Sequence, residues 1–242
     1  MKKIHIIILT LLFPVINAFA KGIDNDEKNA LSKWKAGAVV TPNTITTYGL
    51  EHCFMAEPVS DMVFQRINGK SYRQNPHIQC SDLRYLKVLH YDGNGQIKLG
   101  ELICNKAIAQ DLLTIFRELY DNHYPIERMQ LIDDFDANDE KSMRANNTSC
   151  FCYRTISNST KISKHALGLA VDINPLYNPY YRRYRNGRVK IQPSNAARYS
   201  DRKKQFAYKI DSNDLCYKLF IKHGFQWGGA WTSLKDYQHF EK

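Results

Sequence analysis

The stretch from Ser163 to Asp172 reads S-K-H-A-L-G-L-A-V-D, and a later stretch, from Asp236 to His239, reads D-Y-Q-H. Together they supply two histidines and two carboxylates. A catalytic zinc ion needs three nitrogen or oxygen ligands, an open fourth position and a nearby base. His165, Asp172 and His239 can be the ligands. Asp236 can be the base, because residues three apart on a helical turn lie on roughly the same side.

The order S-x-H-x-x-G-x-A-x-D followed by D-x-x-H resembles the M15 family of zinc peptidases. That family includes D-Ala-D-Ala carboxypeptidases and phage L-alanyl-D-glutamate endopeptidases. Similar sequence surrounds both motifs, with N-N-T-S at 146–149, D-I-N-P at 172–175 and H-G-F-Q-W-G-G at 223–229. The resemblance covers about residues 84–241, and its strongest parts are the segments around the two motifs.

The resemblance implies a role for each residue of the two motifs. His165, Asp172 and His239 would bind Zn²⁺, and Asp236 would be the general base. Arg154 matches the family arginine that engages the substrate, with a structural ion pair as the alternative. A guanidinium group suits this role, because it can hold a carboxylate through two hydrogen bonds or stabilise charge that develops on a carbonyl.

Three further residues have roles that the sequence leaves open. Ser163 is a candidate substrate-binding residue, but it can also support the metal site or merely start the turn. Trp231 can line the substrate cleft or be an ordinary core aromatic residue. Cys152 stands where relatives tend to have asparagine, so it is a rival metal ligand. The nitrogen and oxygen ligands already suffice without it.

The first twenty residues predict export. Lys2 and Lys3 precede a mostly apolar run, and A-F-A at 18–20 is typical of a cleavage site. This pattern indicates a secretory signal peptide, with an uncleaved anchor as the alternative. We therefore expect the protein in the periplasm, the cell envelope or the extracellular space. No later segment is apolar enough to predict a transmembrane span.

The cysteines suit an oxidising compartment, where an even number permits disulfides. All six follow the predicted signal peptide: Cys53, Cys80, Cys104, Cys150, Cys152 and Cys216. We expect at least one intramolecular disulfide. The sequence does not choose among the 15 possible pairings of six cysteines.

The formal net charge is +10, and much of the excess is concentrated between Arg182 and Lys204. This basic segment holds nine Lys and Arg residues against one acid, with tyrosines interleaved. For an exported protein, an anionic cell-wall polymer or an acidic membrane surface is the natural partner of such a segment. A solvated loop is the alternative. No nucleic-acid-binding motif accompanies the charge, so we expect no nucleic acid partner.

The remaining pattern predicts an α+β fold with a small antiparallel sheet flanked by helices, of the D-Ala-D-Ala carboxypeptidase type. Residues 21–83 form an N-terminal lead-in that starts extended, and residues 84–242 form the peptidase domain. An apolar stripe predicts a helix after Asn105 that packs on a sheet. A second helix is expected at about 212–223. Strands are expected at 86–90, 128–133, 169–173 and 238–241.

These features predict a secreted zinc metallopeptidase that hydrolyses amide bonds in peptidoglycan stem peptides. The substrate class comes from the resemblance, which leaves carboxypeptidase and endopeptidase activity both open. One alternative is a non-catalytic, zinc-containing cell-wall binding protein. Another is a structural envelope protein in which the His and Asp pattern is accidental.

Overall fold

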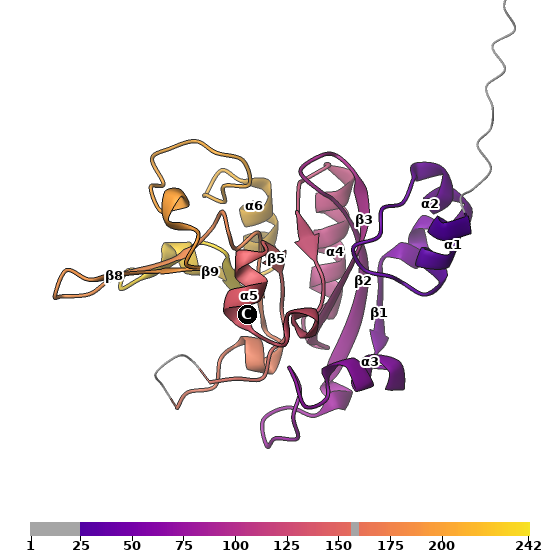
Figure 1. Ribbon diagram of the computed structural model, residues 1–242, viewed down its shortest axis with the longest axis horizontal. Coiled ribbons are helices and arrows are strands. Elements are labelled where there is room, and N and C mark those ends of the chain that lie inside the picture. The colour runs from indigo at the N-terminus through magenta and orange to yellow at the C-terminus, as the bar shows by residue number, and fades with distance from the viewer. Residues whose placement is uncertain (1–24, 156–159) are drawn as a thin grey trace, which may run out of the picture.

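The computed structural model describes residues 25–155 and 160–242. The predicted signal peptide, residues 1–20, lies outside this part of the chain. Helices and small antiparallel sheets alternate along the chain, which confirms the predicted α+β class (Figure 1). The α-helices are α1 (Asn25–Ser32), α2 (Pro42–Tyr48), α3 (Asp61–Ile67), α4 (Ala109–Asp121), α5 (Asp139–Arg144) and α6 (Leu215–Lys222). Short 3₁₀ turns include η1 (Leu50–Cys53), η2 (Cys80–Asp82), η3 (Ile132–Phe135), η4 (His165–Leu167), η5 (Ala197–Tyr199) and η6 (Gly228–Ala230).

The largest sheet has the order β1-β2-β3 and is antiparallel. Its strands are β1 (Met55–Pro58), β2 (Leu83–Tyr91) and β3 (Ile97–Asn105). A tight turn joins β2 to β3, in which the Asp92 carboxylate accepts hydrogen bonds from the amides of Asn94 and Gln96. The expected strand at 86–90 is therefore part of the longest hairpin in the described chain.

Both faces of this sheet are buried, because successive side chains along a strand point to opposite sides. Leu86 and Val88 point toward α4 and α6, where they join one apolar cluster. Tyr85 and Leu89 point the other way and join a second cluster that includes residues of α1, α2 and α3. The sheet thus lies between the N-terminal helices and the C-terminal half of the chain, as Figure 1 shows.

Two small sheets in the C-terminal half carry the two sequence motifs. One has the order β6-β11-β9, with β6 (Ala170–Asp172), β11 (His239–Glu241) and β9 (Gln226–Trp227). The other has the order β10-β7-β8, with β10 (Lys235–Asp236), β7 (Tyr180–Arg183) and β8 (Val189–Gln192). A parallel pair, β4 (Arg128–Met129) and β5 (Asn147–Thr148), completes the described sheets.

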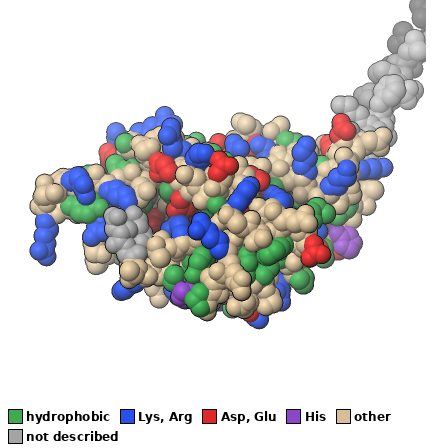
Figure 2. All heavy atoms as spheres, turned by 60° about the horizontal axis from the view of Figure 1, so that its bottom comes forward, with side chains coloured by type: hydrophobic (Ala, Val, Ile, Leu, Met, Phe, Trp, Pro, Cys, Tyr) green, Lys and Arg blue, Asp and Glu red, His purple; other side chains and the backbone are tan. Residues whose placement is uncertain are grey.

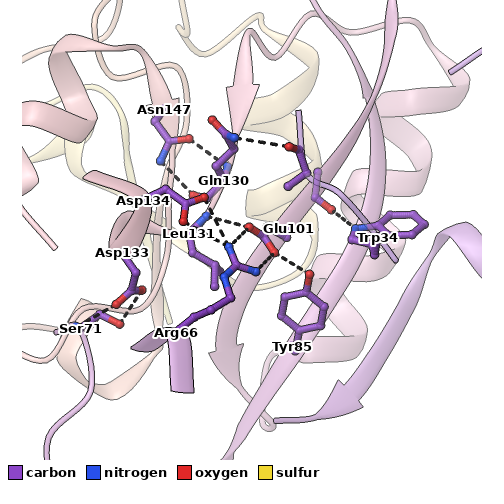
Figure 3. Close-up of polar contacts among 12 residues, drawn as sticks. Trp34, Arg66, Ser71, Tyr85, Glu101, Gln130, Leu131, Asp133, Asp134 and Asn147 are labelled. Atoms are coloured by element: carbon purple, nitrogen blue, oxygen red, sulfur yellow. Dashed lines mark hydrogen bonds and ion pairs between the residues drawn. The ribbon is translucent and has the colours of Figure 1, made fainter. Parts of the chain in front are cut away.

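A buried carboxylate fastens the N-terminal helices to the central sheet. Glu101 on β3 accepts two hydrogen bonds from Arg66 of α3, at 2.8 and 2.6 Å, and one from the Tyr85 hydroxyl at 2.5 Å. Figure 3 shows Arg66 reaching between Glu101 and Asp134 of η3. Residues 25–83 are therefore packed on the sheet, and their start is helical where the sequence suggested an extended chain.

Within residues 84–242, the predicted secondary structure differs from the observed elements mainly at element ends. The helix after Asn105 is confirmed as α4, and the helix at 212–223 is confirmed as α6, which Asp214 caps. The strand expected at 128–133 is shorter, because the chain turns into η3 after Leu131. None of the described helices is long and apolar enough to cross a bilayer.

The structure does not confirm the predicted disulfide, because all six cysteines are free thiols. Cys150 and Cys152 point to different surroundings. The Cys150 thiol lies 3.7 Å from the Gly168 carbonyl, and the Cys152 thiol lies 4.0 Å from the Ala137 carbonyl. Burial raises the pKa of the Cys152 thiol to about 12 and that of Cys150 well above its usual value. Such thiols are poor nucleophiles at neutral pH.

Candidate metal and active site

Three side chains from the two motifs converge at one buried point. His165 Nε2 lies 3.2 Å from His239 Nδ1 and 3.2 Å from an Asp172 carboxylate oxygen. The same Asp172 oxygen lies 3.0 Å from His239 Nδ1. Each of the three side chains is buried. This is the set of His, Cys, Asp and Glu residues in the described chain that could hold a metal ion.

The two C-terminal strands bring two of these side chains together. In the antiparallel pair β6–β11, His239 lies directly opposite Asp172. Directly opposed residues project to the same face of a sheet, so both side chains point to the same side. This pairing explains why residues 67 positions apart in the sequence meet at one point.

A tight turn places the third side chain. His165 begins η4, and its amide donates to the Ser163 hydroxyl. The turn ends at Gly168, whose φ of +66° lies in the left-handed region. A Cβ at Gly168 would lie 2.6 Å from the Asn105 amide nitrogen, so only glycine permits this close approach.

Hydrogen bonds from the outer nitrogens orient both imidazole rings. His165 Nδ1 donates to the Cys150 carbonyl at 2.6 Å, which leaves Nε2 facing the convergence point. His239 Nε2 donates to the Glu241 carboxylate at 3.0 Å, which leaves Nδ1 facing the same point. Metal-binding histidines commonly use their second nitrogen in this way.

The residues present fit a zinc ion. Zinc bonds to nitrogen and oxygen are about 2.0–2.1 Å long, so neighbouring ligand atoms of a tetrahedral site lie about 3.3 Å apart. The observed separations of 3.0–3.2 Å are close to this value. Burial lowers the pKa of His239, but Asp172 and Glu241 outweigh it and raise the pKa to about 10. A cation would therefore displace a proton held between His239 and Asp172.

Asp236 lies beside this point on a different strand. It belongs to β10, whereas His239 begins β11, so the two residues are not on the helical turn that the sequence suggested. Gly228 packs close to both, since a Cβ there would lie 2.8 Å from Asp236 Cβ and 3.3 Å from His239 Cβ. Burial raises the pKa of Asp236 to about 7, an effect to which Asp172 adds and which His239 opposes. Its buried Oδ1 has no hydrogen-bond partner among the described residues.

Arg154 lies on the segment that pairs with the chain around His165. The Ser163 amide donates to the Arg154 carbonyl, and the Cys152 amide donates to the His165 carbonyl. The Arg154 guanidinium forms an ion pair with Asp139 at the start of α5. Its Nε is buried without a partner in the described chain. A third of the side chain is exposed, so the guanidinium can also bind a ligand.

The other three residues that the sequence singled out differ in how they lie relative to the candidate metal ligands. Ser163 is buried and accepts the His165 amide, so it supports the ligand turn. Trp231 is half-buried, and its ring lies 5.4 Å from that of His239, at the edge of the site. Cys152 points toward Ala137 and is not one of the converging metal-ligand candidates in the described residues.

The basic segment from Arg182 to Lys204 is not a single surface. Its first part is the β7–β8 hairpin, which projects from the molecule, at left in Figure 2, and carries Lys and Arg side chains. Its second part includes Arg202, which donates to the carbonyls of Tyr177 and Ile210 and so holds the chain together. The charge at Arg202 is therefore structural.

Two residues of the site were missing from the sequence interpretation. Glu241 orients His239, and Asp139 pairs with Arg154. Glu241 could have been found, because it lies two positions after His239 on a predicted strand and so shares its face. Asp139 is brought near Arg154 only by tertiary packing.

The site brings together three side chains that could hold a metal ion, with a further carboxylate beside them. Residues 157–242 match the model of a family described as D-alanyl-D-alanine carboxypeptidase, which confirms the resemblance to M15 peptidases for this part of the chain. The match includes the three candidate ligands and Asp236. Neither the curated proteins nor the solved structures contain a match to the chain.

Proposed function

We propose that the protein is an exported zinc peptidase that hydrolyses amide bonds in the peptide stems of peptidoglycan. The observation that carries this proposal is the meeting of His165, Asp172 and His239 beside Asp236, within the segment that matches a peptidase family. M15 peptidases are typically zinc-dependent, which supports zinc as the ion for these ligands. The basic and apolar pattern of residues 1–20 supports export.

His165, Asp172 and His239 would hold the ion. A bound zinc ion supplies Lewis acidity, which polarises a carbonyl and makes water more acidic. Asp236 takes the proton of the attacking water and passes it to the leaving amine. Burial raises the pKa of Asp236 above that of an ordinary carboxyl, which favours a group that both accepts and releases a proton.

Arg154 would fix the substrate and stabilise charge. Its guanidinium can donate two hydrogen bonds to a substrate carboxylate, or donate to the carbonyl oxygen as negative charge develops there. An ion pair with Asp139 restrains the side chain. A carboxylate at the end of the substrate would favour a carboxypeptidase, and an internal one would favour an endopeptidase.

A non-catalytic zinc-binding protein is the second candidate. It would use the same three ligands but would need no base. Asp236 argues for the enzyme, because a buried carboxylate oxygen without a partner is costly unless it serves a purpose. The convergence of the two motifs also argues against an accidental pattern in a structural protein.

Digestion of purified peptidoglycan tests the proposal. The mature protein is incubated with peptidoglycan, with and without a chelator, and the products are identified by mass spectrometry. We expect new peptide termini that disappear with chelator and return with added zinc. Zinc-dependent binding without any new terminus would favour the non-catalytic protein. The mass of the product also identifies the bond that is cleaved.

A further inference from the structure

The β7–β8 hairpin is joined directly to the strand that carries the candidate base. In the sheet β10-β7-β8, Asp236 lies opposite Tyr180, and Tyr180 lies opposite Gln192. Residues opposed in this way project to the same face. The face of the hairpin that bears Tyr180 is therefore continuous with the side of β10 that points Asp236 toward the metal ligands.

This face is basic along its length. Arg182 follows Tyr180 by two positions and lies opposite Lys190, so both cations project to the Tyr180 side. The Lys190 ammonium lies 5.6 Å from the centre of the Tyr180 ring. Farther out, the guanidinium groups of Arg182 and Arg188 lie 4.9 and 4.6 Å from the centre of the Tyr184 ring. We call these five residues the basic hairpin face: Tyr180, Arg182, Tyr184, Arg188 and Lys190.

The cations of this face are available to a ligand. Arg182 and Arg188 are exposed, and no carboxylate of the described chain forms an ion pair with either of them or with Lys190. The tyrosine rings stack with the cations and restrict their movement, which lowers the entropy lost on binding. The opposite face differs, because Arg183 there donates to the Tyr181 hydroxyl.

The spacing of the cations matches an extended peptide. Two strand positions span about 6.7 Å and neighbouring strands lie about 4.8 Å apart, so Arg182 lies about two peptide residues from Asp236. Lys190, two strands across, lies about three to four residues away, and Tyr184 about four. A chain bound along this face would extend toward the site that contains Asp236. A polymer that is not cleaved would obstruct that site, whereas the substrate itself would be guided into it.

We propose that the basic hairpin face is a substrate subsite that binds carboxylates of the peptide two to four residues from the cleaved bond. This inference rests on the proposed peptidase function and makes the substrate an anionic peptide. The subsite would contribute to substrate binding rather than to the chemical step, so its loss should raise KM and leave kcat nearly unchanged.

The test compares two double variants with the same loss of charge. Arg182→Gln/Lys190→Gln removes two cations of the face, and Arg183→Gln/Arg185→Gln removes two exposed cations of the same hairpin outside it. Each zinc-loaded protein is assayed with two synthetic stem peptides, one with free side-chain carboxylates and one with carboxamides. We expect the first variant to lose roughly tenfold in kcat/KM on the anionic peptide only, as for about one charge-assisted hydrogen bond. The control variant should match wild type on both peptides.

A binding measurement separates this proposal from the proposed function. The affinity of the fluorescent anionic peptide is measured by anisotropy with Asp236→Asn protein, with and without the hairpin substitutions. Failure of wild type to cleave either peptide would defeat the proposed function, while a tenfold weaker Kd in the Arg182/Lys190 variant would still support the subsite. Equal losses in the two hairpin variants, or no loss in either, would overturn it. The subsite proposal would also be overturned if the Arg182/Lys190 variant bound the peptide normally but lost affinity for a poly(glycerol phosphate), since the face would then bind an anionic polymer and not the substrate.

Discussion

His165 Nε2 and His239 Nδ1 lie 3.2 Å apart, and the second nitrogen of each ring donates to its own acceptor, the Cys150 carbonyl for one and the Glu241 carboxylate for the other. Once a cation displaces the proton that His239 shares with Asp172, the remaining nitrogen of each ring points its lone pair at one place. Because Asp172 also reaches that place, the three residues act as one ligand set.

The ligand set predicts about one zinc ion per protein. His165→Ala removes one of the three ligands and leaves the others, so most of the zinc affinity should be lost. Elemental analysis of dialysed protein measures the effect, with His77→Ala as a control because His77 lies on the exposed surface beside Tyr153. Equal zinc in wild type and His165→Ala would remove this assignment.

Glu241 should tune the affinity of the same site. Glu241→Ala removes the acceptor that orients His239, and loss of such partners typically lowers metal affinity about 10–100-fold. Glu241→Gln keeps an acceptor, so its effect should be smaller. Competition with a chromogenic zinc chelator measures the zinc affinity of both variants. Identical zinc affinity in wild type and Glu241→Ala would show that β11 alone orients the ring.

The sequence was most informative where a motif is local and least informative where tertiary packing decides. His165, Asp172 and His239 could be selected because their types and order are distinctive. The position of Asp236 on a strand could not be predicted, because a three-residue spacing does not distinguish a helical turn from a bend between β10 and β11. The helical start at α1 and α2 was missed because its helices are short.

The same limit applies to buried polar partners. Glu101 looks like any charged residue on an alternating strand, yet it is fully buried between Arg66 and Tyr85. Its partner Arg66 lies 35 positions earlier in the sequence. Long-range pairs of this kind follow from how α3 packs on the sheet, which a single sequence does not specify.

Glu101 should be important for stability. Glu101→Gln leaves the Arg66 charge half-buried without its carboxylate, and breaking such a pair costs about 3–5 kcal/mol in the free energy of unfolding. Asp121→Asn breaks the exposed pair with Arg117 and should change it by less than about 1 kcal/mol. Urea unfolding of the metal-free proteins compares the two. A Glu101→Gln protein as stable as wild type would show that Arg66 finds sufficient compensation in Asp134.

His90 should make the fold sensitive to acid. It is buried, its Nδ1 donates to the Ile126 carbonyl at 2.6 Å, and burial lowers its pKa from 6.5 to about 4. The unfolded chain therefore binds a proton between about pH 6.5 and 4 that the folded protein does not, so stability falls as the pH falls through this window. The shift corresponds to about 3 kcal/mol.

His90→Asn tests the effect, because an asparagine amide can donate to the same carbonyl but does not titrate. The loss in free energy of unfolding between pH 7 and pH 4 should be about 3 kcal/mol smaller in this variant than in wild type. Urea titrations in the presence of chelator keep the metal site out of the comparison. Parallel pH profiles for the two proteins would assign the acid sensitivity to other groups.

Asp236 separates the enzyme from a binding protein. Asp236→Asn keeps the shape of the side chain and leaves all three candidate ligands, but it removes the proton acceptor. General-base catalysis typically contributes about 10²–10⁴-fold, so hydrolysis of a stem peptide should fall by roughly that factor while zinc content and thermal stability change little.

Arg154→Lys gives a different result, because it keeps the charge but loses the planar fork that binds a carboxylate. Its main effect should be on KM or on kcat/KM, with zinc retained. A fully zinc-loaded Asp236→Asn protein with the turnover of wild type would exclude Asp236 as the base. Glu241, a carboxylate beside His239 that is not a candidate ligand, would then be the next residue to test.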